Sequence, residues 1–162
     1  MPGQPLSYLN FGSDGIALSA DGETLFWKAV SERYLYSIPT ARLRDRSTFS
    51  EVAAQASIVS LGETGVTDGM ETDTNGFIYH GIVEQNAVGI FNPSNFTDTI
   101  YVRDPRINWV DTMSIATDGY LYFTSNQLTL SPQTWPGTDR RQRPFALFRF
   151  KLPNNGTKVS LC

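Results

Sequence analysis

The sequence is short of the residues that build many catalytic and metal sites. It contains one cysteine, Cys162, and one histidine, His80, among 162 residues. A single cysteine cannot close an internal disulfide, so the redox compartment stays open. With no second histidine, no cysteine partner and no serine nucleophile elbow, neither a catalytic triad nor a zinc site can be assembled from this chain. His80 is therefore predicted to be a packing or edge residue of a strand.

Long hydrophobic runs and runs of one charge are also absent. No apolar stretch approaches the roughly 18 residues that span a bilayer. The start of the chain, Met1 to Leu6, lacks the basic region and the apolar core of a signal peptide. The net charge is −3 and the Lys and Arg residues form no basic stripe, which argues against a nucleic-acid partner. No Gly-rich phosphate loop lies between a strand and a helix, so a nucleotide cofactor is not expected.

A repeat dominates what is present. Three times an Asp precedes a turn Gly by eight positions, and the copies begin 54 and then 43 residues apart, at Asp14, Asp68 and Asp111. Those lengths fit one four-stranded propeller blade per copy. An aromatic fraction of 12%, with 13 Gly and 9 Pro, favours short strands joined by many turns.

Each copy predicts strands on both sides of a tight turn. The pairs Asp21-Gly22, Asn75-Gly76 and Asp118-Gly119 predict two-residue type I′ hairpins, in which both positions need positive φ. The predicted strands of the three copies are 15–18, 25–27, 34–38 and 57–61; 69–72, 77–79, 87–91 and 99–102; and 112–115, 120–123 and 145–150. One helix is predicted, at 52–56, behind the capping-box spacing of Thr48 and Glu51. Long loops are predicted at 103–109 and 127–144.

These patterns predict an all-β fold: a partial β-propeller of about three blades. The blade-like repeats cover about 13–62, 67–104 and 110–152 of a single domain, residues 1–162, with a preceding strand or linker at 1–12 and a C-terminal tail at 153–162. Because half a ring leaves two sheet faces uncovered, the chain is either a fragment of a larger protein or self-associates through those faces. We favour the fragment.

Four consecutive stretches carry a family resemblance: GSDGIALSADGETLFW, RYLYSIPTARLRD, TDGMETDTNGFIYHG and NWVDTMSIATDGYLYFTSNQL. From about Tyr8 to about Leu152 the chain resembles the major royal jelly protein/Yellow family, in the family's motif order. The resemblance implies the C-terminal half of a six-bladed propeller, extracellular secretion, and a last blade completed by an N-terminal strand. Members of the family include storage proteins, salivary binders of biogenic amines and dopachrome-converting proteins, so the resemblance leaves the function open.

A more distant resemblance links the repeat to the gluconolactonase/regucalcin propellers, which bind a divalent metal at the channel mouth. Ser13-Asp14-Gly15-Ile16 and Thr67-Asp68-Gly69-Met70 look like two of that family's ligand motifs. The resemblance implies Ca²⁺ or another divalent cation held by Asp14 and Asp68, with a Glu ligand supplied from outside this chain. No cofactor follows from the residues themselves.

Asp14, Asp68 and Asp111 are the main candidate site residues. At the starts of three innermost strands they would form an acidic funnel suited to a hard cation or an amine. The alternative is that each Asp only braces its blade through hydrogen bonds to strand-start amides. Thr124 and Asn126 are candidates for hydrogen bonds at the pocket rim, and Trp109 could form an aromatic wall for an amine. Asn95 and Asn155 head glycosylation sequons.

The leading hypothesis is a fragment of a secreted propeller that binds a small ligand, such as a biogenic amine or a catechol-type molecule, at the channel mouth. Neither nucleic acid nor membrane is expected as a partner. Two alternatives stay open: an enzyme, either an isomerase of the dopachrome-converting type or a metal-dependent lactonase, and an inactive, incomplete gene product.

Overall fold

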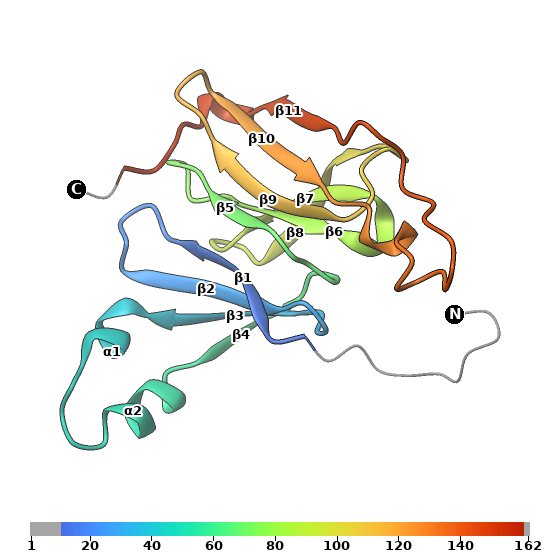
Figure 1. Ribbon diagram of the computed structural model, residues 1–162. Coiled ribbons are helices and arrows are strands. Elements are labelled where there is room, and N and C mark those ends of the chain that lie inside the picture. Colours follow the sequence, from blue (N-terminus) through green and yellow to red (C-terminus); the bar gives the residue numbers. More distant parts are fainter. Residues whose placement is uncertain (1–10, 161–162) are drawn as a thin grey trace.

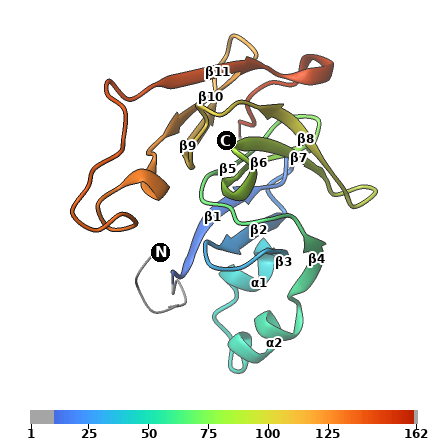
Figure 2. The same cartoon turned by 90° about the vertical axis from the view of Figure 1, so that its right-hand side faces the viewer.

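The computed structural model describes residues 11–160, and Figure 1 shows three antiparallel sheets. Most of the predicted strand or linker at 1–12, and Cys162, lie outside the described residues. The first sheet has the order β1-β2-β3-β4, the second β5-β6-β7-β8 and the third β11-β10-β9. Figure 2 shows the sheets fanning out around their inner strands β1, β5 and β9. The predicted all-β partial propeller is confirmed, with each sheet forming one blade.

The strand bounds follow the repeat. Blade 1 consists of β1 (Ser13–Leu18), β2 (Thr24–Ala29), β3 (Tyr34–Pro39) and β4 (Val59–Glu63). Blade 2 consists of β5 (Met70–Thr72), β6 (Ile78–Ile82), β7 (Ala87–Asn92) and β8 (Thr97–Arg103). Blade 3 consists of β9 (Val110–Ile115), β10 (Tyr120–Ser125) and β11 (Leu147–Lys151), with no fourth strand among the described residues. Short 3₁₀ turns occur at η1 (Val83–Gln85), η2 (Leu128–Leu130) and η3 (Pro153–Asn155).

Apolar faces of neighbouring blades form two core clusters. Successive residues of a strand point to opposite faces of its sheet. Blades 1 and 3 bury one face each, whereas blade 2 lies between them and is buried on both faces. Between blades 1 and 2 the cluster is Ala17, Phe26, Leu35, Met70, Ile78 and Phe91. Between blades 2 and 3 it is Tyr79, Val88, Ile107, Val110, Met113, Ile115, Leu121, Phe123 and Leu152. The blades are therefore held face to face by hydrophobic burial.

The predicted type I′ hairpins are wrong in their turn type. Within these three pairs only the glycines have positive φ, at 74° for Gly22, 80° for Gly76 and 78° for Gly119; the residue before each Gly does not. In blade 3, Gly119 N donates to Ala116 O and Ala116 N donates to Tyr120 O. This is a three-residue loop, a type I turn followed by a left-handed Gly. The Asp before the Gly has a different use, because Asp118 Oδ1 accepts the Tyr120 N–H at 3.1 Å.

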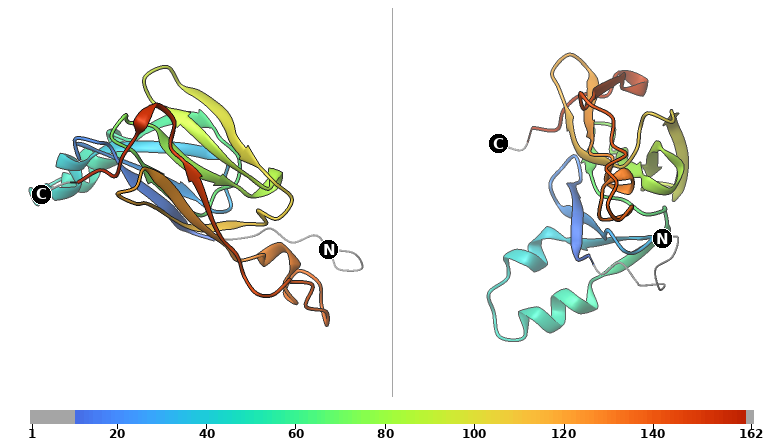
Figure 3. Two further views of the ribbon diagram at one scale, coloured as in Figure 1. Left: turned by 90° about the horizontal axis from the view of Figure 1, so that it is seen from above. Right: turned by 45° about the vertical axis from the view of Figure 1, so that its right-hand side comes forward.

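The helix prediction was incomplete and its cap was wrong. Two helices, α1 (Thr40–Arg44) and α2 (Ser50–Ala56), connect β3 to β4 and project from blade 1, as Figure 3 shows. The sequence signalled only α2. Its N-cap is Phe49, in the left-handed region at φ 69°, with no side-chain cap hydrogen bond. Thr48 therefore does not cap the helix. No helix in the described part of the chain is long and apolar enough to cross a membrane.

The segment after β11 is docked on blade 2. Asp73 and Lys158 form an isolated antiparallel bridge, and Thr74 N donates to Thr157 O at 3.0 Å. Asp73 is fully buried there and accepts hydrogen bonds from the backbone N–H groups of Asn75 and Phe77. The part of the predicted C-terminal tail that the structure describes is thus a packed element that fastens blade 3 to blade 2.

Candidate ligand site at one end of the propeller axis

The three predicted carboxylates lie at the same end of the inner strands. Asp14 is in β1, Asp68 is two residues before β5, and Asp111 is in β9. β1 contacts β5 and β5 contacts β9, so the three strand starts are neighbours. The structure thus brings the carboxylates into one region, around the start of the inner strands.

The glycine after each of the first two carboxylates explains how close the blades come. A Cβ added to Gly15 would lie 2.6 Å from Asp68 O, and one added to Gly69 would lie 2.0 Å from Asp111 O. Both distances are shorter than real Cβ contacts allow. Each Gly therefore permits the backbone of the next blade to approach. The third repeat has Thr112 at this position, and Thr112 is exposed.

Asp68 is the central carboxylate and the most perturbed. Its Oδ2 accepts the Trp109 Nε1–H at 2.6 Å. Its pKa is raised from 3.8 to about 6, chiefly because the group is half-buried, and the Trp109 hydrogen bond opposes the shift. The neighbouring Asp14 carboxyl and the charge of Asp111 raise the pKa further. Three carboxylates therefore repel one another here, which a bound cation would relieve.

Asn126 joins this group, whereas Thr124 serves the sheet. Asn126 Nδ2 donates to Asp111 Oδ2 at 3.0 Å, and Asn126 Oδ1 accepts the Leu128 N–H at 2.8 Å. Thr124 Oγ1 accepts the Thr112 N–H at 3.3 Å and is exposed. Among residues 11–160, a hydrogen bond connects Asn126, but not Thr124, to one of the three carboxylates. The geometry supports Asn126 as a site residue more strongly than Thr124.

Trp109 binds a carboxylate, a contact that the suggested aromatic wall for an amine did not include. It is buried, with a positive φ of 59°, and its indole N–H is committed to Asp68. It orients the central carboxylate and covers one side of it. The only sequence signal for this role is its position two residues before Asp111, and the partner Asp68 lies 41 residues away.

Two buried basic side chains brace the connection between blades 1 and 2. Lys28 is fully buried and donates to Thr64 Oγ1 at 2.6 Å and to Gly65 O. Burial lowers its pKa to about 8. His80 is buried as well, with Nε2 2.8 Å from Asp98 Oδ1 and Nδ1 3.3 Å from Thr67 Oγ1. His80 packs inside the sheet, as predicted, and neither residue belongs to the axial site.

The residues present do not make a complete metal site. Within residues 11–160 no group of three or more His, Cys, Asp or Glu side chains is placed to hold a metal ion. Asp14 and Asp68 supply two carboxylates, and Asp68 already uses one oxygen for Trp109. Since Ca²⁺ takes six to eight oxygen ligands, this pair alone does not fit the ion.

The two sequon asparagines lie at the other end of the blades. Asn95 is in the turn between β7 and β8, where its Oδ1 accepts the Thr97 N–H at 3.2 Å. Asn155 is in η3, after β11. Both side chains belong to exposed residues. Because the strands alternate in direction, these turns are at the end opposite to the starts of β1, β5 and β9.

Comparisons with solved structures agree with the propeller architecture. A gluconolactonase from Xanthomonas campestris superposes with a TM-score of 0.62 at 18% identity, over 93% of this chain and 47% of that one. A calcium-binding protein, regucalcin, from Agrobacterium tumefaciens gives 0.58 at 14% identity, over 91% and 47%. A luciferin-regenerating enzyme gives 0.59 at 16% identity, over 92% and 49%. The chain spans about half the length of these structures, and identities this low show a shared fold alone.

The sequence itself assigns the family. No curated protein matched the chain. The family described as "Major royal jelly protein", however, matches residues 4–145, which is most of the chain. This agrees with the resemblance carried by the strand-start motifs around Asp14, Asp68 and Asp111. The chain belongs to the major royal jelly protein family.

Proposed function

We propose that this chain is half of a secreted β-propeller that binds a small cationic ligand, such as a biogenic amine, at the end of the axis where the inner strands begin. The observation that carries the proposal is the half-buried Asp68 carboxyl, held by Trp109 beside Asp14 and Asp111. An ammonium group there would replace carboxylate repulsion with charge-assisted hydrogen bonds. Asn126, bound to Asp111, supplies a further polar group at the rim.

The proposal predicts a dependence of affinity on pH. Asp68 must lose its proton to pair with an ammonium ion, and its pKa is about 6. Amine binding should therefore tighten as the pH rises from 5 to 7 and then level off, because the carboxylate is fully formed above that range. Binding at pH 5 should release a proton.

Isothermal titration calorimetry with dopamine and serotonin as probes tests the proposal. Asp68→Asn and Asp111→Asn should each weaken binding by about tenfold, the usual cost of losing a charged hydrogen-bond partner. Asp21→Asn is the matched control, because it removes the same charge from the turn at the other end of β1. Equal affinities for all four proteins, or no pH dependence, would refute an axial amine site.

A second candidate is proton transfer of the dopachrome-converting type. It is favoured by the pKa of about 6 for Asp68, because a general acid–base group works best near the operating pH. Turnover of dopachrome that is lost in Asp68→Asn, with the fold intact, would support it. Absence of turnover in a protein that contains all the blades would remove it.

A metal-dependent lactonase is the third candidate, and it requires ligands beyond Asp14 and Asp68. A calcium titration followed by thermal unfolding tests it, because a ligand that binds only the folded state raises the Tm. An unchanged Tm at millimolar Ca²⁺, in a protein with all its blades, would exclude the metal and with it the lactonase.

Secretion is part of the proposal and rests on the family and the sequons. Asn95 and Asn155 are exposed at the end away from the carboxylates, so glycans there would leave the ligand site accessible. Expression through an insect-cell secretory pathway, with a mass shift on glycosidase treatment, would support it. Secreted protein without that shift would remove the glycans from the proposal.

A further inference from the structure

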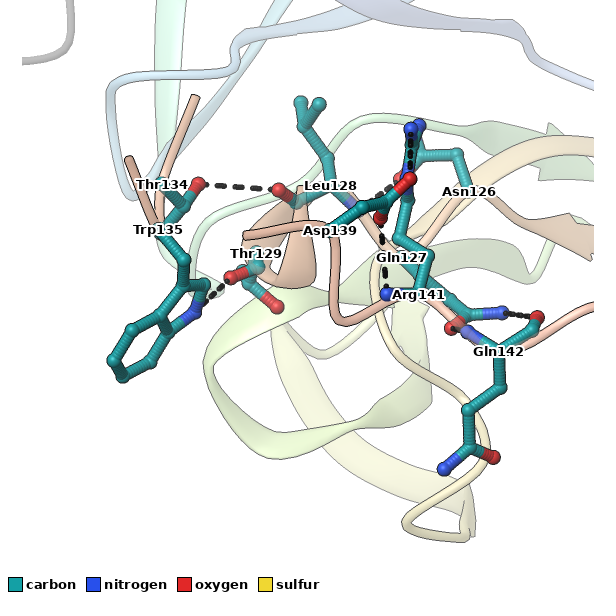
Figure 4. Close-up of polar contacts among 9 residues, drawn as sticks. All are labelled: Asn126, Gln127, Leu128, Thr129, Thr134, Trp135, Asp139, Arg141 and Gln142. Carbon is teal, nitrogen blue, oxygen red and sulfur yellow. Dashed lines mark hydrogen bonds and ion pairs between the residues drawn. The ribbon is translucent and has the colours of Figure 1, made fainter. Parts of the chain in front are cut away.

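The long connection between β10 and β11, residues 126–146, is held by hydrogen bonds within itself, and we call it the wall. Figure 4 shows that its two ends are tied by the Gln127 side chain, which pairs with the backbone of Gln142 in both directions. Gln127 Nε2 donates to Gln142 O at 2.9 Å, and Gln142 N donates to Gln127 Oε1 at 2.7 Å. Arg140 N also donates to Leu130 O at 2.9 Å. A surface held in this way needs little ordering when it binds a ligand.

This wall borders an open cavity that belongs to none of the sites described so far. The cavity has a volume of about 390 Å³ and lies between the wall, β11 and the connection from β8 to β9. Much of its lining is apolar: Pro105, Leu130, Pro144, Ala146 and Phe148. Mostly apolar cavities of this size with a few polar groups are typical of small-molecule sites.

The polar groups of the cavity include hydrogen-bond donors. Arg106 is the only charged residue among the described residues that line it. Arg106 donates from Nε to Asp104 Oδ1 at 2.9 Å and from Nη2 to Asp104 Oδ2 at 2.7 Å. The remaining N–H groups of the guanidinium are available to a ligand. Asn108 commits its side-chain oxygen to Thr129 at 2.7 Å, which leaves its NH₂ group as a donor. A guanidinium and an amide donor that line the same cavity suit a carboxylate, which can accept from both.

We propose that this cavity binds a small aromatic carboxylate. The ring lies against the prolines and Phe148, and the carboxylate pairs with Arg106 and Asn108. The ligand differs in charge from the one proposed for the axial site. The two sites use different side chains. Asn126 is hydrogen-bonded to Asp111 in the axial site. Gln127, the next residue, is hydrogen-bonded to Gln142 at the cavity.

Fluorescence titration with 2-naphthoate, an aromatic carboxylate of suitable size, tests the proposal, with 2-naphthamide as the neutral probe. Arg106→Gln should weaken 2-naphthoate binding about tenfold and leave 2-naphthamide nearly unchanged. Arg141→Gln is the matched control, because Arg141 pairs with Asp139 through the same two nitrogens outside the cavity lining. It should leave both affinities unchanged.

Two further variants separate this site from the axial one and from a folding defect. Asp68→Asn should leave 2-naphthoate binding unaltered, whatever its effect on amines. Gln127→Ala should weaken both naphthalene probes, because it frees the wall, while near-ultraviolet circular dichroism reports whether the blades remain packed. No saturable binding of 2-naphthoate below 1 mM, or equal losses in Arg106→Gln and Arg141→Gln, would overturn the proposal.

Discussion

Replacing Gly69 by alanine should disrupt the contact between blades 2 and 3. The added Cβ would lie 2.0 Å from Asp111 O and 2.9 Å from the carbon of the same carbonyl. An ordinary contact begins near 3.4 Å. The obstacle is backbone, so relief requires the inner strands to move apart by more than 1 Å, and the two apolar faces behind them must move as well.

The expected cost is at the upper end of overpacking effects, about 3 kcal/mol or more. For a chain of this size about 1 kcal/mol corresponds to roughly 2–4 °C in Tm, so Gly69→Ala should lower the Tm by about 6–12 °C. Gly15→Ala should cost less, because its contact with Asp68 O is 2.6 Å. Differential scanning calorimetry measures both changes.

Gly12→Ala is the control for the change of glycine to alanine itself. No atom lies within 4 Å of its added Cβ, and its φ is not in the left-handed region. It should be neutral or stabilising by about 0.5 kcal/mol, through the unfolded chain. A Gly69→Ala protein that melts within 2 °C of the wild type would refute the role assigned to the Asp-Gly pairs.

Three further predictions concern charge and surface. The pKa of Asp68 is raised from 3.8 to about 6, so the protonated carboxyl stabilises the folded state below pH 4 and this stabilisation is lost as the pH rises through 6. Asp68→Asn should therefore have a higher Tm than the wild type at pH 7 but not at pH 4. The pKa of Lys28 is lowered from 10.5 to about 8, so the unfavourable free energy of its buried charge is relieved as the pH rises from 8 to 10.5. The Tm of the wild type should rise across that range relative to the Tm of Lys28→Met. Equal changes of Tm with pH in the two proteins would contradict this. Ile16 and Leu18 are exposed on the free face of blade 1, so self-association, if it uses this face, should be abolished by Ile16→Glu in light-scattering measurements of mass.

The sequence by itself determined the blades. Alternating apolar residues and Gly-containing turns depend on neighbours in the chain, so the positions of the strands follow from local patterns, as does the absence of a fourth strand after β11 within residues 11–160. The same local signals missed α1, because a five-residue helix whose N-cap is Pro39 carries no capping side chain. They also misjudged the turns, where the Asp side chain binds a backbone N–H and only the Gly takes positive φ.

The tertiary structure alone decided what the repeated Asp-Gly pairs do. The sequence placed three carboxylates at three strand starts, but it could not show that Gly15 and Gly69 admit the backbone of the next blade. Nor could it show that Trp109 binds Asp68 across 41 residues, or that Asn126 rather than Thr124 reaches Asp111. These contacts join segments that are distant in the chain. The distance between such segments in space is set only when the blades pack against one another.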